Sequence, residues 1–135
     1  GDKWIDHSIG VVMFAINEKH LWRSINDEKH VPIRRKYGSI MWADLGERLV
    51  DYPPFQGLSD CQVEMIQRAR WIFTHGFACL LNNNERPEKK EDHIVHTIRR
   101  VSQAILDDFK NDPSVVIGQS LFQSMPPDCR EKHET

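Results

Sequence analysis

The chain has 135 residues, which is the size of one domain with a single hydrophobic core. Charged residues make up 28% and hydrophobic residues 39%, the formal net charge is -2, and no basic stretch is long enough to follow a phosphate backbone, so this chain by itself is a poor candidate for binding nucleic acid. No apolar run reaches the roughly 18 to 20 residues that a membrane-spanning helix needs, and no signal peptide is recognisable, so we expect no association with a membrane.

The N-terminal third of the sequence predicts three helices. Residues 3–17 have apolar side chains at helical spacing, and a short second helix follows over 21–25 after an interruption at 17–20. Pro32 suits the first turn of a third helix that extends to about residue 51. We expect the apolar stripe of this third helix to face the core and its charged residues to face water. The stripe consists of Ile33, Tyr37, Ile40, Met41, Ala43, Leu45, Leu49 and Val50, and the charged residues include Arg34, Arg35, Lys36, Glu47 and Arg48.

The segment 59–84 predicts the central helix of the domain. Ser59 followed three positions later by Gln62 is a capping-box start, and the run of asparagines at 82–84 ends the helix. From Trp71 to Leu81 the helix is apolar on nearly every side, so we expect it to be covered all round by neighbouring helices or by a second copy of the chain. A glycine in a helix interior costs about 1 kcal/mol, so Gly76 indicates close approach of another helix.

The remaining segments complete an all-helical fold. The prolines in 52–58 exclude regular structure, 85–92 is a charged connection, 93–110 is a long amphipathic helix, and 114–124 is one more short helix. No segment has the alternation of a half-buried strand. We therefore predict an all-α bundle of about five to six helices, with one domain over 1–125 and a disordered tail over 126–135.

The three cysteines, Cys61, Cys79 and Cys129, are scattered and form no CxxC pair. This pattern predicts reduced thiols in a cytoplasmic protein, with Cys79 in the core. The sequence begins at Gly1 without an initiator Met, which favours the C-terminal part of something longer.

The sequence contains none of the motifs that would indicate an enzyme or a cofactor site. We find no Glu-x-x-His pair of a di-iron bundle, no HExxH, no zinc pattern, no phosphate loop and no GxSxG turn, so we expect no catalytic activity, no metal and no cofactor. His93 and His96 are one helical turn apart, but they lie on the polar side of their helix and are interpreted as a solvated pair. His75 is the one titratable group in an apolar run. It is either a core histidine bonded to a carbonyl or hydroxyl, or a polar anchor inside a ligand cavity.

Two stretches resemble a known family. ARWIFTHGFACLL (69–81) resembles a segment in the C-terminal domains of TetR-family transcriptional regulators, in which an aromatic run precedes His-Gly and small apolar residues, and GVVMFAINEKHLWRSI (10–25) is similar to an earlier helix of that family. The order of the helices also matches. The family's N-terminal helix-turn-helix domain has no counterpart here, so DNA is expected as a partner only through a missing domain.

The resemblance implies an effector-binding domain that forms a homodimer. The last two long helices would pack against their symmetry mates, and the earlier helices would enclose a mostly apolar cavity for a small apolar or amphipathic effector. The expected dimer contacts are Gly76, Leu80, Ile98, Val101 and Ile105. The expected cavity residues are Phe14, Trp22, Met41, Trp42, Trp71 and His75, and for each aromatic residue the alternative is that it only fills the core. The alternative for the whole chain is a helical protein–protein interaction module without a small ligand.

Overall fold

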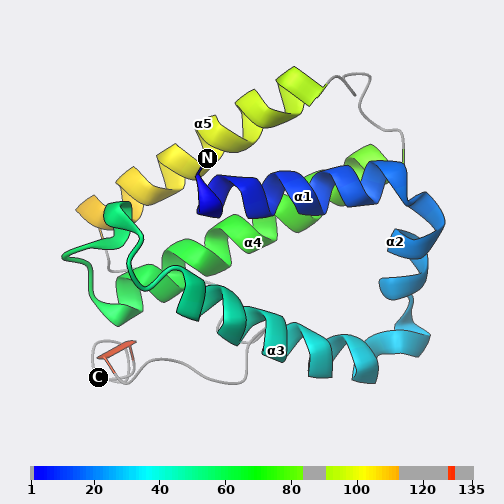
Figure 1. The fold of residues 1–135 in the computed structure, drawn as a ribbon, viewed down its shortest axis with the longest axis horizontal. Coiled ribbons are helices and arrows are strands. Elements are labelled where there is room, and N and C mark those ends of the chain that lie inside the picture. Colours follow the sequence, from blue (N-terminus) through cyan, green and yellow to red (C-terminus); the bar gives the residue numbers. More distant parts are fainter. Residues whose placement is uncertain (1, 84–90, 113–127, 130–135) are drawn as a thin grey trace.

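The computed structural model describes residues 2–83, 91–112 and 128–129, and this part of the chain contains helices and no strand. The elements are α1 (Lys3–Asn17), α2 (Lys19–Ile25), the 3-10 turn η1 (Glu28–His30), α3 (Val31–Arg48), the 3-10 turn η2 (Pro53–Phe55), α4 (Asp60–Asn82) and α5 (Glu91–Asn111) (Figure 1). The predicted all-α fold class is confirmed, although η2 shows that the proline-rich connection does contain one regular turn. Within the described residues, no helix combines the length and the hydrophobicity that crossing a membrane requires.

Helices α1 and α4 run parallel to each other and are joined by hydrogen bonds along their whole length (Figure 1). The bonds are Trp4 Nε1 to Gln67 Oε1 at 2.7 Å, Ser8 Oγ with Thr74 Oγ1 at 2.9 Å, and Asn82 Nδ2 to the Ala15 carbonyl at 2.9 Å. The residue numbers rise together on both helices, which is the pattern of a parallel pair. Each buried polar group on this seam therefore has a partner, and a shift of one helix along the other would break several bonds at once.

At the N-terminal end of this seam, a buried arginine packs against an indole. The Arg70 guanidinium lies 4.4 Å from the centroid of the Trp4 ring, and its Nη1 donates to the Trp4 carbonyl. Burial lowers the pKa of Arg70 to about 9, and the charges of Tyr52 and Asp2 oppose this effect in part. The guanidinium therefore stays charged at neutral pH while it anchors the first turn of α1.

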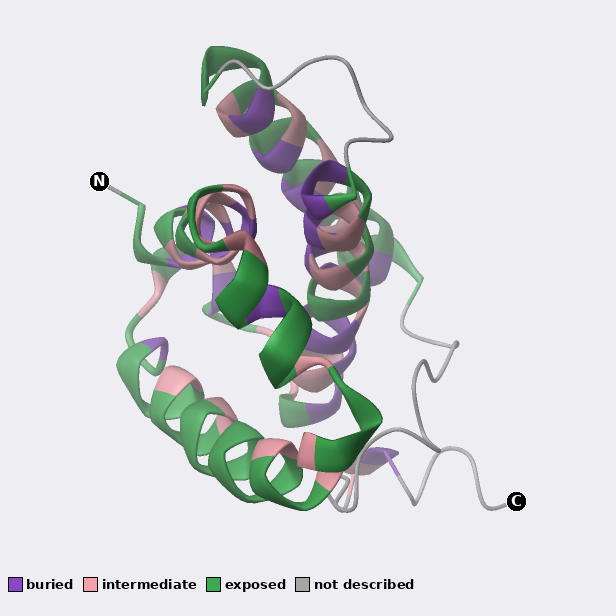
Figure 2. Cartoon of the chain, turned by 90° about the vertical axis from the view of Figure 1, so that its right-hand side faces the viewer, coloured by how far each residue is buried: buried purple, intermediate pink, exposed green. Residues whose placement is uncertain are grey.

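Helix α5 completes the core and runs antiparallel to α4. Gln62 Nε2, in the first turn of α4, donates to the carbonyl of Phe109 near the end of α5 at 3.3 Å. Figure 2 shows the buried residues concentrated on α1, α4 and α5. Fully or almost fully buried apolar side chains of the three helices are Trp4, Val12, Ala15, Met65, Ile66, Ala78, Leu81, Ile94, Ile98 and Leu106.

Helix α3 stands apart from this core, which is the main departure from the sequence-based prediction. No residue of α3 is buried, and the first half of the stripe expected to face the core, Ile33, Tyr37, Ile40 and Met41, is exposed (Figure 2). The end of the stripe agrees with the prediction, because Leu45 packs against the core and Leu49, directly after α3, is buried. Arg34, expected to face water, is only half-exposed. The periodicity of this segment was too weak to define an inward face, because apolar and charged residues alternate around the helix.

The start of α4 agrees with its prediction, whereas its surroundings do not. The Ser59 hydroxyl accepts from the Gln62 amide and the Gln62 side chain accepts from the Ser59 amide, both at 3.0 Å, which confirms the capping box. The expectation that the apolar half is covered all round is wrong for the single chain, since Trp71, Ile72 and Leu80 are exposed by 41%, 38% and 41%. A Cβ added to Gly76 would meet no atom within 4 Å, so no helix in the described part of the chain approaches this glycine closely.

The prediction of three reduced cysteines is also wrong. Cys61 and Cys129 form a disulfide between residues 68 positions apart, and Cys79 is the free thiol. Cys129 is buried and the neighbouring Asp128 accepts a hydrogen bond from the Cys61 amide at 2.9 Å, so the predicted disordered tail is ordered at these two residues. Sequence spacing could not show this pairing, because it depends on where residues 128–129 return to α4.

Other predicted segments fall wholly or partly outside the described residues. These are the short helix at 114–124, most of the charged connection at 85–92, and the rest of the tail. Residues 91–92 belong to α5, which begins earlier than the predicted residue 93. The division into 1–125 and 126–135 stays a prediction.

The disulfide predicts a defined count of reactive thiols. In denaturant without a reductant, one of the three cysteines should react with a thiol reagent, and all three should react after reduction. Cys129→Ala should lower the free energy of unfolding by about 2 kcal/mol because it frees a long loop in the unfolded chain. Cys79→Ala is the control that keeps the bridge. Three reactive thiols in the unreduced protein would contradict this pairing.

Candidate ligand-binding site

A cluster of aromatic rings lies where α1, α2 and α4 meet. The His75 ring on α4 stacks on Trp71 at a centroid distance of 5.2 Å and an interplanar angle of 14°, and it contacts Trp22 of α2 at 5.4 Å. Trp22 in turn meets the edge of Phe14 of α1 at 6.5 Å. Four of the six predicted cavity residues, Phe14, Trp22, Trp71 and His75, therefore form one continuous wall.

The helical period explains how α4 contributes its part of this wall. Trp71, His75 and Cys79 are each four residues apart, so their side chains lie in a row on one face of the helix. The Cys79 Sγ atom is 3.7 Å from His75 Nε2. Cys79 was expected to be an ordinary core residue, yet it is half-buried beside the histidine, and the spacing of 71, 75 and 79 was the signal that would have placed it there.

His75 is held by rings and a thiol and not by the carbonyl or hydroxyl expected of a core histidine. Among the described residues, its contacts are the two indoles and Cys79. Burial lowers its pKa below the usual 6.5, and the positive charge of Arg34 lowers it further. The imidazole is therefore neutral at pH 7 and offers a weak, uncharged hydrogen-bonding group at the edge of an apolar wall.

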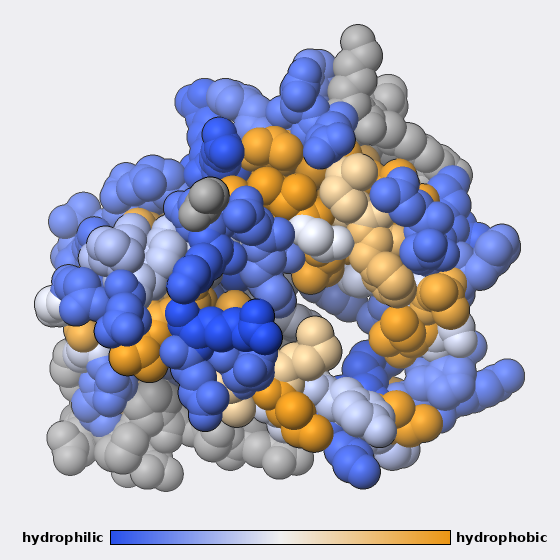
Figure 3. All heavy atoms as spheres, viewed as in Figure 1, coloured by the Kyte–Doolittle hydropathy of each residue, from blue (hydrophilic) through white to orange (hydrophobic). Residues whose placement is uncertain are grey.

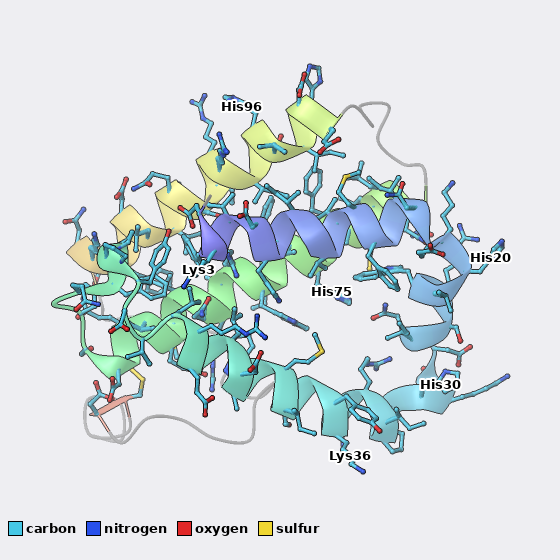
Figure 4. The ribbon with its side chains drawn as sticks, viewed as in Figure 1. Lys3, His20, His30, Lys36, His75 and His96 are labelled. Atoms are coloured by element: carbon cyan, nitrogen blue, oxygen red, sulfur yellow. A yellow bond between two sulfur atoms is a disulfide. The ribbon has the colours of Figure 1, made fainter. Side chains whose placement is uncertain are left out.

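Helix α3 lies opposite this wall. Figure 4 shows His75 pointing from α4 toward α3, and Figure 3 shows an opening between α3 and the body of α1 and α4, bordered in part by apolar side chains. Met41 on α3 is 62% exposed, and the Trp42 Nε1 donates to Glu64 Oε1 of α4 at 3.3 Å. These two predicted cavity residues thus lie on α3, across the opening from the ring cluster, and Trp42 forms a hydrogen bond that links α3 to α4.

The start of α3 is fastened to the end of α2 by Arg34. Its Nη1 donates to the carbonyls of Ile25 at 3.0 Å and Asp27 at 3.3 Å. This role could not be predicted, because Arg34 belongs to a run of three basic residues that is typical of a solvated helix face. The structure instead places its guanidinium at the end of α2, next to the Ile25 carbonyl and three residues along the chain from Trp22, whose ring contacts His75.

A second hollow, at the N-terminus of α1, is lined by charged side chains together with a tyrosine and two prolines. It has a volume of about 480 Å³ and is lined by Asp2, Lys3, Arg48, Asp51, Tyr52, Pro53 and Pro54. The Tyr52 hydroxyl donates to both carboxylate oxygens of Asp2 at 2.8 Å, and burial followed by this bond raises the pKa of Tyr52. Acidic and basic side chains balance here, so the groove lacks the apolar wall of the first site.

The described residues contain no group of three or more His, Cys, Asp or Glu side chains placed to hold a metal ion. His93 and His96 are exposed on α5. Carboxylate and histidine ligands are thus not gathered at the aromatic wall, and the chemistry that this wall offers is stacking, apolar contact and one uncharged imidazole.

The residues predicted for a dimer contact lie in different environments. Gly76 and Leu80 are exposed on α4 and, with Ile72, form an outward stripe at spacings of four. Val101 and Ile105 are half-buried on α5. Ile98 is fully buried in the core of its own chain, so it lies away from any surface that a partner could touch.

Comparison of the sequence with models of protein families and with curated proteins, and of the structure with solved structures, finds no match.

The environment of His75 predicts a pH dependence of stability. Because the folded state lowers its pKa below 6.5, protonation favours unfolding, so its contribution is present above pH 6.5 and is lost as the pH falls toward the lowered value. His7 on α1, whose pKa burial and Arg70 also lower, acts in the same direction. In His75→Phe, which keeps a ring against Trp71, the melting temperature should fall less between about pH 7.5 and about pH 5 than in the wild type.

The matched control for this experiment is His96→Gln, because His96 on α5 touches neither indole. An identical drop in melting temperature for the wild type and His75→Phe would show that His75 is equally easy to protonate in the folded and unfolded chains.

Proposed function

We propose that this chain is the effector-binding and dimerisation domain of a TetR-type transcriptional regulator, and that a small apolar or amphipathic ligand binds between the aromatic wall and α3. The observation that carries the proposal is the opening between α3 and the body of α1 and α4 (Figure 3), toward which His75 points from α4 (Figure 4). Ligand sites are concave, mostly apolar and carry few placed polar groups, and this wall has that composition.

The arrangement of α3 supports a mechanism for the proposed regulation. Three hydrogen bonds hold α3, which we call the arm: two from Arg34 to the carbonyls of Ile25 and Asp27, and one from Trp42 to Glu64. Its apolar side chains Ile33, Ile40 and Met41 stay exposed. A ligand that touches both the wall and α3 favours the arrangement in which both contacts are made. The segment that follows α3 contacts the start of α1 through the bond from the Tyr52 hydroxyl to Asp2, so a helix-turn-helix domain attached ahead of α1 would respond to a movement of α3, which is how such a ligand would modulate DNA binding.

A cytoplasmic location is part of this proposal, because a regulator of the family that the sequence resembles acts on DNA there. The cysteines do not support a cytoplasmic location, since two of the three form a disulfide.

The ligand site predicts a loss of affinity in Trp71→Ala. Apolar and amphipathic compounds that raise the melting temperature of the wild type should bind this variant about tenfold more weakly, because a stacking surface is lost. Ile72→Ala is the matched control, since Ile72 is the next residue, is similarly exposed and lies outside the ring cluster. A broad compound screen in which no compound shifts the midpoint, or equal weakening by both variants, would count against a ligand site on this wall.

The second candidate is a protein–protein interaction module, favoured by the outward stripe of Ile72, Gly76 and Leu80. Helix dimers often pack through small residues flanked by apolar ones, and dimerisation belongs to both candidates. The two differ in whether the opening beside His75 binds a ligand.

The stripe predicts a dimer that Gly76→Leu converts to a monomer. A side chain at 76 meets no atom of its own chain within 4 Å, so the fold should tolerate the change and the helix should gain about 1 kcal/mol. A partner packed closely at this glycine would be displaced. Light scattering measures the molar mass, and Gly10→Leu on α1, where a Cβ is equally free, is the control. A monomeric wild type, or a dimeric Gly76→Leu, would remove this stripe as the contact.

A further inference from the structure

We infer that the opening beside the aromatic wall selects an aromatic carboxylate, whose ring stacks on the wall and whose carboxylate bonds to Arg34. This inference rests on the proposed ligand site and adds the chemical class of the ligand. Three observations carry it: the form of the wall, the unused hydrogen-bonding capacity of Arg34, and the lack of a balancing carboxylate.

The wall is built for a flat apolar group. Trp71 is 41% exposed although its ring already stacks on His75, so one part of the indole is still open to a ligand. Trp22, which is buried, and Phe14, which is half-buried, pack behind His75 and support this surface from α2 and α1. Aromatic rings prefer offset-stacked or edge-on partners, and a planar ring system matches this surface better than a branched alkyl group.

Arg34 is placed to bind an anion at the end of this wall. Both of its hydrogen bonds use Nη1, so within the described part of the chain Nε and Nη2 have no hydrogen-bond partner. The two carbonyls of Ile25 and Asp27 hold the guanidinium in one orientation, which lowers the entropy lost when an anion binds. A guanidinium presents its N–H groups as a planar fork that matches the two oxygens of a carboxylate.

The charge of Arg34 is not balanced by a protein carboxylate. Among the described residues, the ion pairs are Arg48 with Asp44 and Arg68 with Glu64, and neither involves Arg34. Glu64, the acidic residue that reaches the facing side of α3, accepts hydrogen bonds from Trp42 and from Arg68. The Asp27 carboxylate, on the residue whose carbonyl Arg34 bonds, accepts from the Lys29 amide and forms no ion pair with Arg34, and His75 adds no charge because it is neutral at pH 7. A half-buried cation without a counter-ion favours an anionic ligand over a neutral one of the same shape.

The test compares 2-naphthylacetate with its neutral amide, 2-naphthylacetamide, by calorimetric titration of the full chain at low salt. The wild type should bind the carboxylate about tenfold more tightly than the amide, which is the gain expected from one charge-assisted hydrogen-bonded pair. Arg34→Gln should abolish this preference, so that the carboxylate and the amide bind with equal affinity; because Arg34 also fastens α3 to α2, the readout is the ratio of the two affinities and not either affinity alone. Arg35→Gln removes the same charge from the neighbouring exposed residue and should keep the preference.

Arg34→Lys distinguishes a binding role from a structural one, because it keeps the charge and loses the planar fork. It should retain a reduced preference for the carboxylate, and thermal melts of all variants show whether α3 is still held. Equal affinity of the wild type for both probes, or a preference that survives in Arg34→Gln, would overturn the inference while leaving the ligand site intact. Failure of both probes to bind, where other compounds bind in a Trp71-dependent way, would also overturn it. If no compound binds at all, the result contradicts the proposed ligand site itself, and the inference about the ligand class is overturned with it.

Discussion

The hydrogen-bonded seam between α1 and α4 is the constraint on which the rest of the structure depends. Trp4, Ser8 and the Ala15 carbonyl meet Gln67, Thr74 and Asn82 in register. Asn82 is the important member, because its side chain also reaches the Lys19 carbonyl and accepts from Arg23 Nε, which fixes the start of α2. Since α2 carries Trp22, the seam sets where that indole meets His75. A polar interaction at the end of the core thus positions an aromatic wall at its edge.

The same constraint divides the molecule into a fixed body and a loosely held arm. The body of α1, α4 and α5 buries most of the apolar side chains, whereas α3 buries none (Figure 2). Fully burying one large apolar side chain contributes about 1.5–3 kcal/mol, so the exposed Ile33, Ile40 and Met41 represent stability that the single chain does not gain. A molecule that covers part of this surface would stabilise the arm in one position. The free energy gained by covering one of these side chains is small, but it is comparable with the contribution of the few hydrogen bonds that hold α3.

The sequence allowed the local structure to be predicted and left most long-range relations open. Ser59 and Gln62 mark the start of α4 because a capping box involves residues only three positions apart. The ring cluster was largely predictable, since Trp71 and His75 share a helix face and the resemblance added Phe14 and Trp22. Asn82 looked like a helix stop and Arg34 like a solvated charge, because their partners lie on other helices. The Cys61–Cys129 bridge was missed for the same reason, as its partners are 68 positions apart.

The division of α4 into faces limits how a ligand could affect a partner. The row of Trp71, His75 and Cys79 faces α2 and α3, the row of Ile72, Gly76 and Leu80 faces outward, and Thr74, Ala78 and Leu81 are buried against the core. A ligand on the first row and a second chain on the next row would touch the same helix. However, the seam with α1 holds α4 in register, so α4 cannot slide without breaking Ser8–Thr74 and Asn82–Ala15. Because Asn82 also fixes the start of α2, movement must occur in α3, and a ligand signal would reach a partner through displacement of α3 and not through a shift of α4.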